Sequence, residues 1–261
     1  MNKLYRYIIS FCVLSILAIA NPIDDKAPQF VYEGAPISKI VKDNQYIIKK
    51  NYAIHYRFDT KTAEYVVEHP TKEKVNGTSK RKDDFRPDTD IAKQHQSVLA
   101  DYAGEAYDRG HLVPAGNSTQ NDDVMSESFF LSNMVPQVPN HNRGIWKQLE
   151  TAVRIWVNEG KDIYVITGTF YNKEHKQIGE RVGVPDYMWK VIVDAKSEKG
   201  IAFWFPNAPL PVADLPKYIV SIDEIEKKTS INFNPKMPEK LQKALESAKA
   251  NPSEWSGIIK N

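Results

Sequence analysis

Cysteine is almost absent from this chain of 261 residues, because Cys12 is the only one. A protein so poor in cysteine is not held together by disulfides and must rely on core burial. The six histidines include no His-x-x-x-His pair, so a zinc site is not expected either. The chain also lacks a phosphate-cradling glycine-rich loop, which argues against nucleoside triphosphate chemistry.

No apolar run is long enough to cross a membrane, which takes about 20 residues. The longest begins at Ile8, after Lys3 and Arg6, and ends in Ala-Ile-Ala at 18–20, a small-x-small cleavage pattern before Asn21. We therefore predict a cleaved signal peptide over residues 1–20. The protein is therefore expected to be secreted or periplasmic and to have no stable association with a membrane. An uncleaved membrane anchor is the alternative.

Excess charge of one sign is lacking as well. The chain has 35 basic and 33 acidic residues, and loss of Lys3 and Arg6 with the leader would leave 33 of each. Attraction to polyanions must therefore come from local clusters of basic residues. The densest cluster lies in the loop-like stretch 75–90 and contains Lys80, Arg81, Lys82 and Arg86. For the lysines, an ordinary solvated loop is the alternative.

Linkers, repeats and low-complexity tracts are missing between Phe30 and Ala248. Residues 21–261 are therefore predicted to form a single domain with its core at about 30–250. Period-2 patterns and turn residues predict strands at 52–58, 63–68, 111–115, 162–171, 188–195 and 201–207. Helices are expected at 143–158, after Ser221, and at 238–249. This mixture has no βαβ rhythm, which indicates an α+β fold with a mostly antiparallel central sheet flanked by helices.

The segment "YDRGHLVPAGN" at 107–117 offers an arginine and a histidine around one glycine. Residues two apart on a strand share a face, so Arg109 and His111 can converge on one phosphate. A neutral imidazole can take a proton from water near neutral pH. Gly110 would allow either a special backbone geometry or a close approach of substrate. A purely structural histidine is the alternative, and Asp108 is assigned a structural role.

The segment "NRGIWKQLETAVR" at 142–154 places further polar groups on a helix. Its apolar residues cover one arc, in which Asn142 falls, while Glu150 and Arg154 lie at the edge one turn apart. Glu150 and Arg154 could form an ordinary ion pair. Asn142 and Glu150 are roughly 12 Å apart along an ideal helix axis, so a shared hard ion such as Mg²⁺ would reach Glu150 through a bound water.

Together with "SNMVPQ" at 132–137, these two segments closely resemble the motifs of the DNA/RNA non-specific endonuclease family. The resemblance extends from about Tyr46 to Lys228, and its motifs lie within 81–154. It implies a ββα-metal (His-Me finger) nuclease fold, in which a hairpin presents the histidine and the following helix presents the metal ligand.

The resemblance also implies a role for each matching residue. His111 would be the general base and Asn142 the sole protein ligand of Mg²⁺, with Mn²⁺ as an alternative ion. Asn133 would be an active-site asparagine, and Glu150 would hold a metal-bound water. The arginines that match phosphate-binding positions are Arg81, Arg109 and Arg154.

The expected function is therefore that of an exported Mg²⁺-dependent endonuclease that cuts DNA and/or RNA into products with 5′-phosphates. Contacts to phosphate rather than to bases would explain indifference to sequence. Two alternatives remain: a catalytically inactive nucleic-acid-binding protein, and a phosphodiesterase of small nucleotides. Homodimers occur in the family, but no segment here identifies an interface.

Overall fold

The computed structural model describes residues 21–40, 42–104 and 106–258. The expected signal peptide and Cys12 lie outside these ranges. Asn21, the residue after the expected cleavage point, accepts a hydrogen bond from the amide of Ile23 at the start of the first helix. Within the described ranges, no helix combines the length and apolar composition that crossing a bilayer requires.

A seven-stranded sheet forms the centre of the protein, in the order β1-β2-β3-β6-β9-β10-β11. Every neighbouring pair in it is antiparallel. The strands are β1 (Asn44–Ile48), β2 (Tyr52–Arg57), β3 (Thr62–Glu68), β6 (Ile163–Phe170), β9 (Tyr187–Asp194), β10 (Lys199–Pro206) and β11 (Ile219–Val220). The α+β fold with a mostly antiparallel sheet is thereby confirmed.

Two short antiparallel pairs lie outside this sheet: β4 (Asp108–His111) with β5 (Met134–Gln137), and β7 (Gln177–Ile178) with β8 (Val182–Gly183). The α-helices are α1 (Pro22–Lys26), α2 (Lys72–Val75), α3 (Asp122–Glu127), α4 (Lys147–Asn158), α5 (Ile222–Thr229) and α6 (Glu239–Glu246). A π-helical turn, His141–Trp146, leads into α4. The 3₁₀ turns are Pro28–Phe30, Lys93–His95, Leu99–Tyr102, Ala115–Asn117, Leu131–Asn133, Val212–Tyr218 and Pro252–Glu254.

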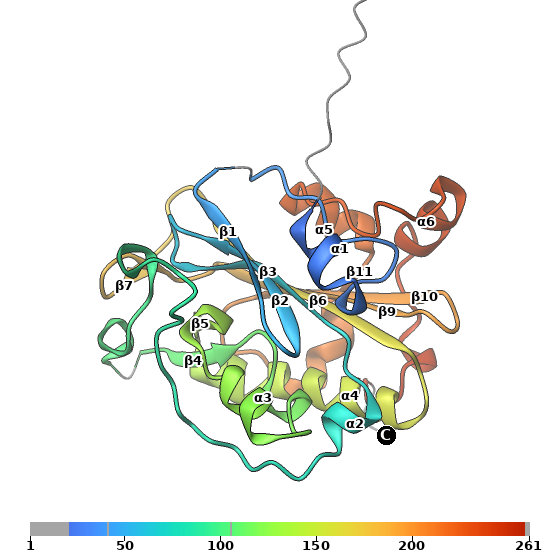
Figure 1. Ribbon diagram of the computed structural model, residues 1–261. Coiled ribbons are helices and arrows are strands. Elements are labelled where there is room, and N and C mark those ends of the chain that lie inside the picture. The colour runs from blue at the N-terminus through green and yellow to red at the C-terminus, as the bar shows by residue number, and fades with distance from the viewer. Residues whose placement is uncertain (1–20, 41, 105, 259–261) are drawn as a thin grey trace, which may run out of the picture.

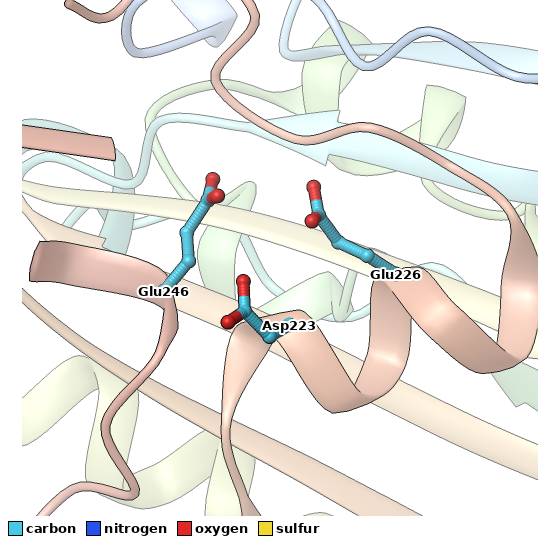
Figure 2. Close-up of side chains that lie close together, drawn as sticks. All are labelled: Asp223, Glu226 and Glu246. Atoms are coloured by element: carbon cyan, nitrogen blue, oxygen red, sulfur yellow. The ribbon is translucent and has the colours of Figure 1, made fainter. Parts of the chain in front are cut away.

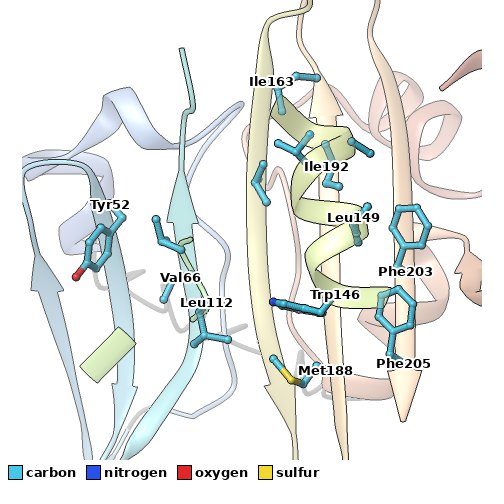
Figure 3. Packing of buried hydrophobic residues seen from close by; sticks show 14 of the residues in the cluster. Tyr52, Val66, Leu112, Trp146, Leu149, Ile163, Met188, Ile192, Phe203 and Phe205 are labelled. Carbon is cyan, nitrogen blue, oxygen red and sulfur yellow. The ribbon is translucent and has the colours of Figure 1, made fainter. Parts of the chain in front are cut away.

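The two faces of the sheet carry different layers (Figure 1). Helix α4 and the β4–β5 pair cover one face, where Trp146 and Leu149 pack with Ile192 and Phe203 of the sheet (Figure 3). Helices α1, α5 and α6 cover the other face and pack on the side chains that alternate with these. Because successive residues of a strand point to opposite faces, β9 supplies Ile192 to the first core and Val191 to the second.

Helix α4 follows its sequence closely. The six apolar residues of the predicted arc are all buried: Ile145, Trp146, Leu149, Val153, Trp156 and Val157. The helix ends where Gly160, at φ +91°, takes a left-handed conformation. The amides of Gly160 and Lys161 then reach back to the carbonyls of Val157 and Trp156. This is the Schellman arrangement, which favours glycine at that position.

Two predicted elements differ from the structure. The strand expected at 111–115 is wrong, because β4 covers 108–111 and the following backbone turns away at Pro114. His111 is therefore the last residue of its strand rather than the first. The helix expected from 143 begins instead with the π-helical turn, and Gly144 inside it has a non-helical φ of −105° and ψ of −107°.

Candidate active site

The β4–β5 hairpin presents Arg109 and His111 toward one cavity. In its register Gly110 lies opposite Val135, and His111 lies opposite Met134. A Cβ on Gly110 would fall 2.0 Å from Oε1 of Gln137, a fully buried side chain. The glycine is therefore needed for packing against Gln137 between the two strands, which is neither of the two expected reasons, a special backbone geometry or a close approach of substrate.

The backbone around His111 is attached to both neighbouring layers. From the π-helical turn before α4, Nε1 of Trp146 donates a hydrogen bond to the His111 carbonyl at 3.2 Å. From the central sheet, Nζ of Lys190 donates to the Leu112 carbonyl at 3.4 Å. Helix and sheet thus fix the position of the imidazole from two sides.

The His111 ring is 8% exposed and packs edge-on against Phe129, with ring centres 5.1 Å apart and planes at 90°. Phe85 makes a second edge contact at 5.8 Å. Burial, together with the charge of Arg81, lowers the pKa of His111 to about 3. The ring is therefore neutral at neutral pH, and a phosphodiester anion bound beside it would raise this pKa.

Asn142 is oriented by a carboxylate. Its Nδ2 donates to Oδ2 of Asp108 at 2.8 Å, so its Oδ1 is left without a hydrogen bond among the described residues. Arg143 holds the same carboxylate through two hydrogen bonds of 2.8 and 2.6 Å. Burial alone would raise the pKa of Asp108, but the bonds from Arg143 and Asn142 outweigh it and lower this pKa. Ionised at neutral pH, the Asp108 carboxylate only accepts hydrogen bonds, so it binds the amide nitrogen of Asn142 and leaves the amide oxygen turned outward.

Glu150 has a carboxylate without a hydrogen bond or ion pair in the described part of the chain. The ordinary ion pair with Arg154 is not formed, because Arg154 instead donates to Oγ1 of Thr151 at 3.0 Å. Burial raises the pKa of Glu150 to about 7 against the lowering effect of Lys190 and Arg154. The carboxylate is thus half ionised near neutral pH and free to accept from a ligand or water.

Three arginines surround these groups. The guanidinium of Arg109 lies 4.2 Å from the centre of the Phe85 ring, and that of Arg81 lies 5.0 Å from Phe129. Stacking on aromatic faces orients a guanidinium without consuming its N–H donors. Arg81 also binds Asp83 at 2.6 Å, whereas Arg109 makes no ion pair in the described ranges.

One cavity of about 340 Å³ joins nearly all of these residues. Its lining is Arg81, Arg109, His111, Pro114, Ala115, Gly116, Asn142, Arg143, Lys147, Glu150 and Arg154. A neighbouring cavity of about 470 Å³ shares Arg109 and Arg143 with it. Five basic side chains against one carboxylate make the first cavity a site for an anion.

Asn133 is the one predicted site residue that the structure does not bring into this cavity. It is fully buried, its Oδ1 accepts from the amide of Val113, and its Nδ2 donates to the carbonyls of Val113 and Ser128. All its contacts are therefore to backbone. Asn133 therefore fixes the backbone at Val113, just after His111.

The charged groups beneath the site were not predicted from the sequence. Lys190 lies fully buried in β9, where it donates to Oγ1 of Thr167 at 2.6 Å and lies 4.5 Å from the Trp146 ring centre. Glu68, also buried, interacts with Lys190 and accepts two hydrogen bonds from Asn117. A lysine within the apolar run "MWKVIVDA" was the available signal for this buried charge.

Comparison with known proteins identifies the family. The sequence profile of the DNA/RNA non-specific endonuclease family matches residues 29–240. A nuclease from Nostoc is 31% identical over 82% of this chain and 82% of its own length. Human mitochondrial endonuclease G is 32% identical over 72% of this chain and 68% of its own length.

A solved structure of an EndoG/EndoGI complex contains a chain that matches with a TM-score of 0.73 and 29% identity. The match covers 82% of this chain and 93% of that one. Fold and sequence together define an enzyme of the metal-dependent nucleases. The chain belongs to the DNA/RNA non-specific endonuclease family, as its motifs predicted, and it hydrolyses nucleic acid.

Proposed function

We propose that this protein is an exported, Mg²⁺-dependent, non-specific endonuclease that cuts DNA and/or RNA and leaves 5′-phosphates. One observation carries the proposal: His111, Asn142 and Glu150 line a single cavity with Arg81, Arg109 and Arg154. These are the groups that deprotonating a water, holding a hard cation and binding a phosphodiester require.

His111 acts as the general base. Its neutral ring accepts a proton from a water, whose oxygen forms a bond to phosphorus as the bond from phosphorus to the 3′ oxygen breaks. The negative charge of the bound phosphodiester raises the pKa of the ring toward the pH at which the reaction runs. The leaving 3′ oxygen takes up a proton from solvent.

Asn142 and Glu150 fit a hard divalent cation. The Oδ1 of Asn142 makes no hydrogen bond in the described chain, and Asp108 anchors the rest of that amide. Asn142 would ligate Mg²⁺ directly and Glu150 would hold one of its waters, because Mg²⁺ keeps several waters in its shell. The bound ion supplies charge neutralisation at phosphate and leaving oxygens. Mn²⁺ prefers similar oxygen ligands.

Arg109 and Arg154 bind the oxygens of the scissile phosphate, and Arg81 adds a third guanidinium. The ring of Phe85 orients Arg109, and the ring of Phe129 orients Arg81. A hydrogen bond to Thr151 orients Arg154. Since such contacts reach phosphate rather than base edges, they carry no sequence information. Asn133 serves as a positioning residue for the chain around His111 rather than as a catalytic one.

The test is hydrolysis of plasmid, RNA and a dinucleotide ester by the mature protein, with Mg²⁺ or with EDTA. We expect Mg²⁺-dependent cleavage of the polymers, which His111→Ala abolishes while the circular dichroism spectrum stays unchanged. Residual activity above about one per cent in this variant would exclude His111 as the base. Binding without hydrolysis would indicate an inactive relative, and preference for the dinucleotide ester a small-nucleotide phosphodiesterase.

Export is tested separately by sequencing the N-terminus of the protein recovered outside the cytoplasm. We expect it to begin at Asn21. Recovery of the protein in the membrane fraction with residues 1–20 attached would support the anchor instead.

A further inference from the structure

Three carboxylates meet on the face of the sheet opposite the nuclease cavity. Asp223 and Glu226 belong to α5, and Glu246 is the last residue of α6. One oxygen of each lies within 4.8 Å of the others, and Figure 2 shows the three side chains turned toward a common space. The family profile ends at residue 240, so it does not include Glu246.

Glu246 is the unusual member of this cluster. The residue is only 3% exposed, yet its Oε1 is buried without a hydrogen-bond partner in the described chain. Glu226 uses one oxygen to accept from the amide of Phe233 at 2.7 Å and has the other free. Asp223 is exposed to solvent and makes no hydrogen bond through its side chain within the described ranges.

No ion pair with a basic group balances these acids in the described part of the chain. Across the described residues, no lysine or arginine nitrogen lies within 4.0 Å of the three carboxylates, and Lys228 of α5 pairs with Glu224 instead. Burial, followed by the charge of Glu226 and then that of Asp223, raises the pKa of Glu246 to about 8 against a lowering effect of the Gln242 amide. Without a cation, ionising all three groups would place uncompensated like charges side by side, which is costly where one of them is buried.

We propose that Asp223, Glu226 and Glu246 form a structural Ca²⁺ site that joins α5 to α6. Oxygens bound to one Ca²⁺ at roughly 2.3–2.6 Å can lie up to about 5 Å apart, so the observed spacing fits. Mg²⁺ requires shorter distances and stricter octahedral geometry, which favours Ca²⁺ for a trio split between two helices. Waters would complete the shell on the exposed side, at Asp223.

This site is separate from the proposed nuclease metal site, because Asn142 belongs to the turn that leads into α4, and α4 covers the other face of the sheet. Its occupation would hold together the two helices that cover the second core. Binding of Ca²⁺ to a protonated Glu246 would also release a proton.

The experiment is calorimetric titration of the mature chain with CaCl₂ at pH 8, in an Asn142→Ala background that removes the active-site ligand. Thermal unfolding with and without CaCl₂ is recorded in parallel. We expect one bound Ca²⁺ and a higher Tm with it. Glu246→Gln or Asp223→Asn should weaken binding at least tenfold, whereas the matched control Glu239→Gln, an exposed acid on α6, should leave it unchanged.

The solvent-exposed Asp223→Asn change keeps the test decisive if Glu246→Gln does not fold. The absence of Ca²⁺ binding in the Asn142→Ala protein, or equal binding in all three acid variants, would overturn the proposal. Either result would leave the nuclease assignment untouched, because Mg²⁺-dependent cleavage is measured on the unmodified active site.

Discussion

Glu150 and Glu246 lie on opposite faces of the sheet. Both have a raised pKa, but the charges around them differ. Burial raises the pKa of Glu150 to about 7, and Lys190 and Arg154 oppose that rise. Burial raises the pKa of Glu246 to about 8, and there the neighbouring charges of Glu226 and Asp223 add to the rise. The first carboxylate is therefore compensated by the protein, whereas the second is uncompensated.

The difference indicates two uses of an acid with a raised pKa. At the nuclease cavity, the positive charges of Lys190 and Arg154 keep the Glu150 carboxylate partly ionised near neutral pH, where it can orient a water. Over the second core, three acids without a cation favour an ion supplied from solvent. A raised carboxylate pKa thus accompanies a preorganised site in one place and an ion-dependent contact in the other.

Among changes to the charged groups around the two glutamates, removal of the Glu150 carboxylate should have the largest effect. Glu150→Gln should lower kcat/KM on the order of 100-fold, the upper range for a group that acts through a metal-bound water. The wild-type pH profile of kcat/KM should rise through about pH 7 as Glu150 ionises, and the variant should lose this limb. An unchanged limb in Glu150→Gln would assign the ionisation to another group.

Loss of the carboxylate behind Asn142 should have the next largest effect. Asp108→Ala frees the Asn142 amide to rotate, so the Mg²⁺ concentration needed for half-maximal activity should rise roughly tenfold. Asp59→Ala is the matched control, because Asp59 binds Arg57 through two hydrogen bonds as Asp108 binds Arg143. Equal Mg²⁺ requirements in both variants would argue against an orienting role for Asp108.

Removal of the positive charge of Lys190 should change the pH dependence of activity. Lys190→Met takes away the main charge that lowers the pKa of Glu150, so the rising limb should move about one unit to higher pH. Activity at pH 7 should fall several-fold and recover near pH 9, while Lys190→Arg should keep the wild-type profile. A uniform loss at all pH values in Lys190→Met would mean that Lys190 serves only the fold.

The uncompensated acid should affect stability rather than activity. Because the folded pKa of Glu246, about 8, lies above its ordinary value of 4.5, the wild type loses stability as pH rises from about 4.5 to 8. Glu246→Gln does not titrate, so without Ca²⁺ its Tm should exceed that of the wild type by roughly 5 °C at pH 8 and little at pH 5. Nuclease activity should not change. Parallel Tm curves would show that Glu246 does not titrate abnormally.

Local patterns in the sequence predicted most of the fold. The apolar arc of α4, its end at Gly160 and the strands β2, β3, β6, β9 and β10 follow short-range periodicity, whereas β1 and β11 were not predicted. The strand expected at 111–115 failed because the side chain of Asn133, twenty residues away, satisfies the backbone of Val113 in place of a neighbouring strand. An ideal-helix projection of Asn142 also failed, since the turn around Gly144 is not α-helical.

The charges beneath the site depend on contacts that no local pattern contains. Glu68, Glu150 and Lys190 come from β3, α4 and β9, and only the folded chain brings them together. The same holds for Glu246, whose neighbours Asp223 and Glu226 lie on another helix. Residues that match a motif could therefore be chosen from the sequence, but the groups that set their protonation could not.

The most direct test of the nuclease site is a double-mutant cycle on His111 and Asn142, with kcat/KM for plasmid cleavage measured for both single variants and the double. If the imidazole and the amide act on one scissile bond, each single Ala variant should lose kcat/KM on the order of 1,000-fold. The double variant should then lose little more than the less active of the two single variants. Losses that multiply in the double variant, or a single variant that keeps more than about one per cent of activity, would contradict a shared site.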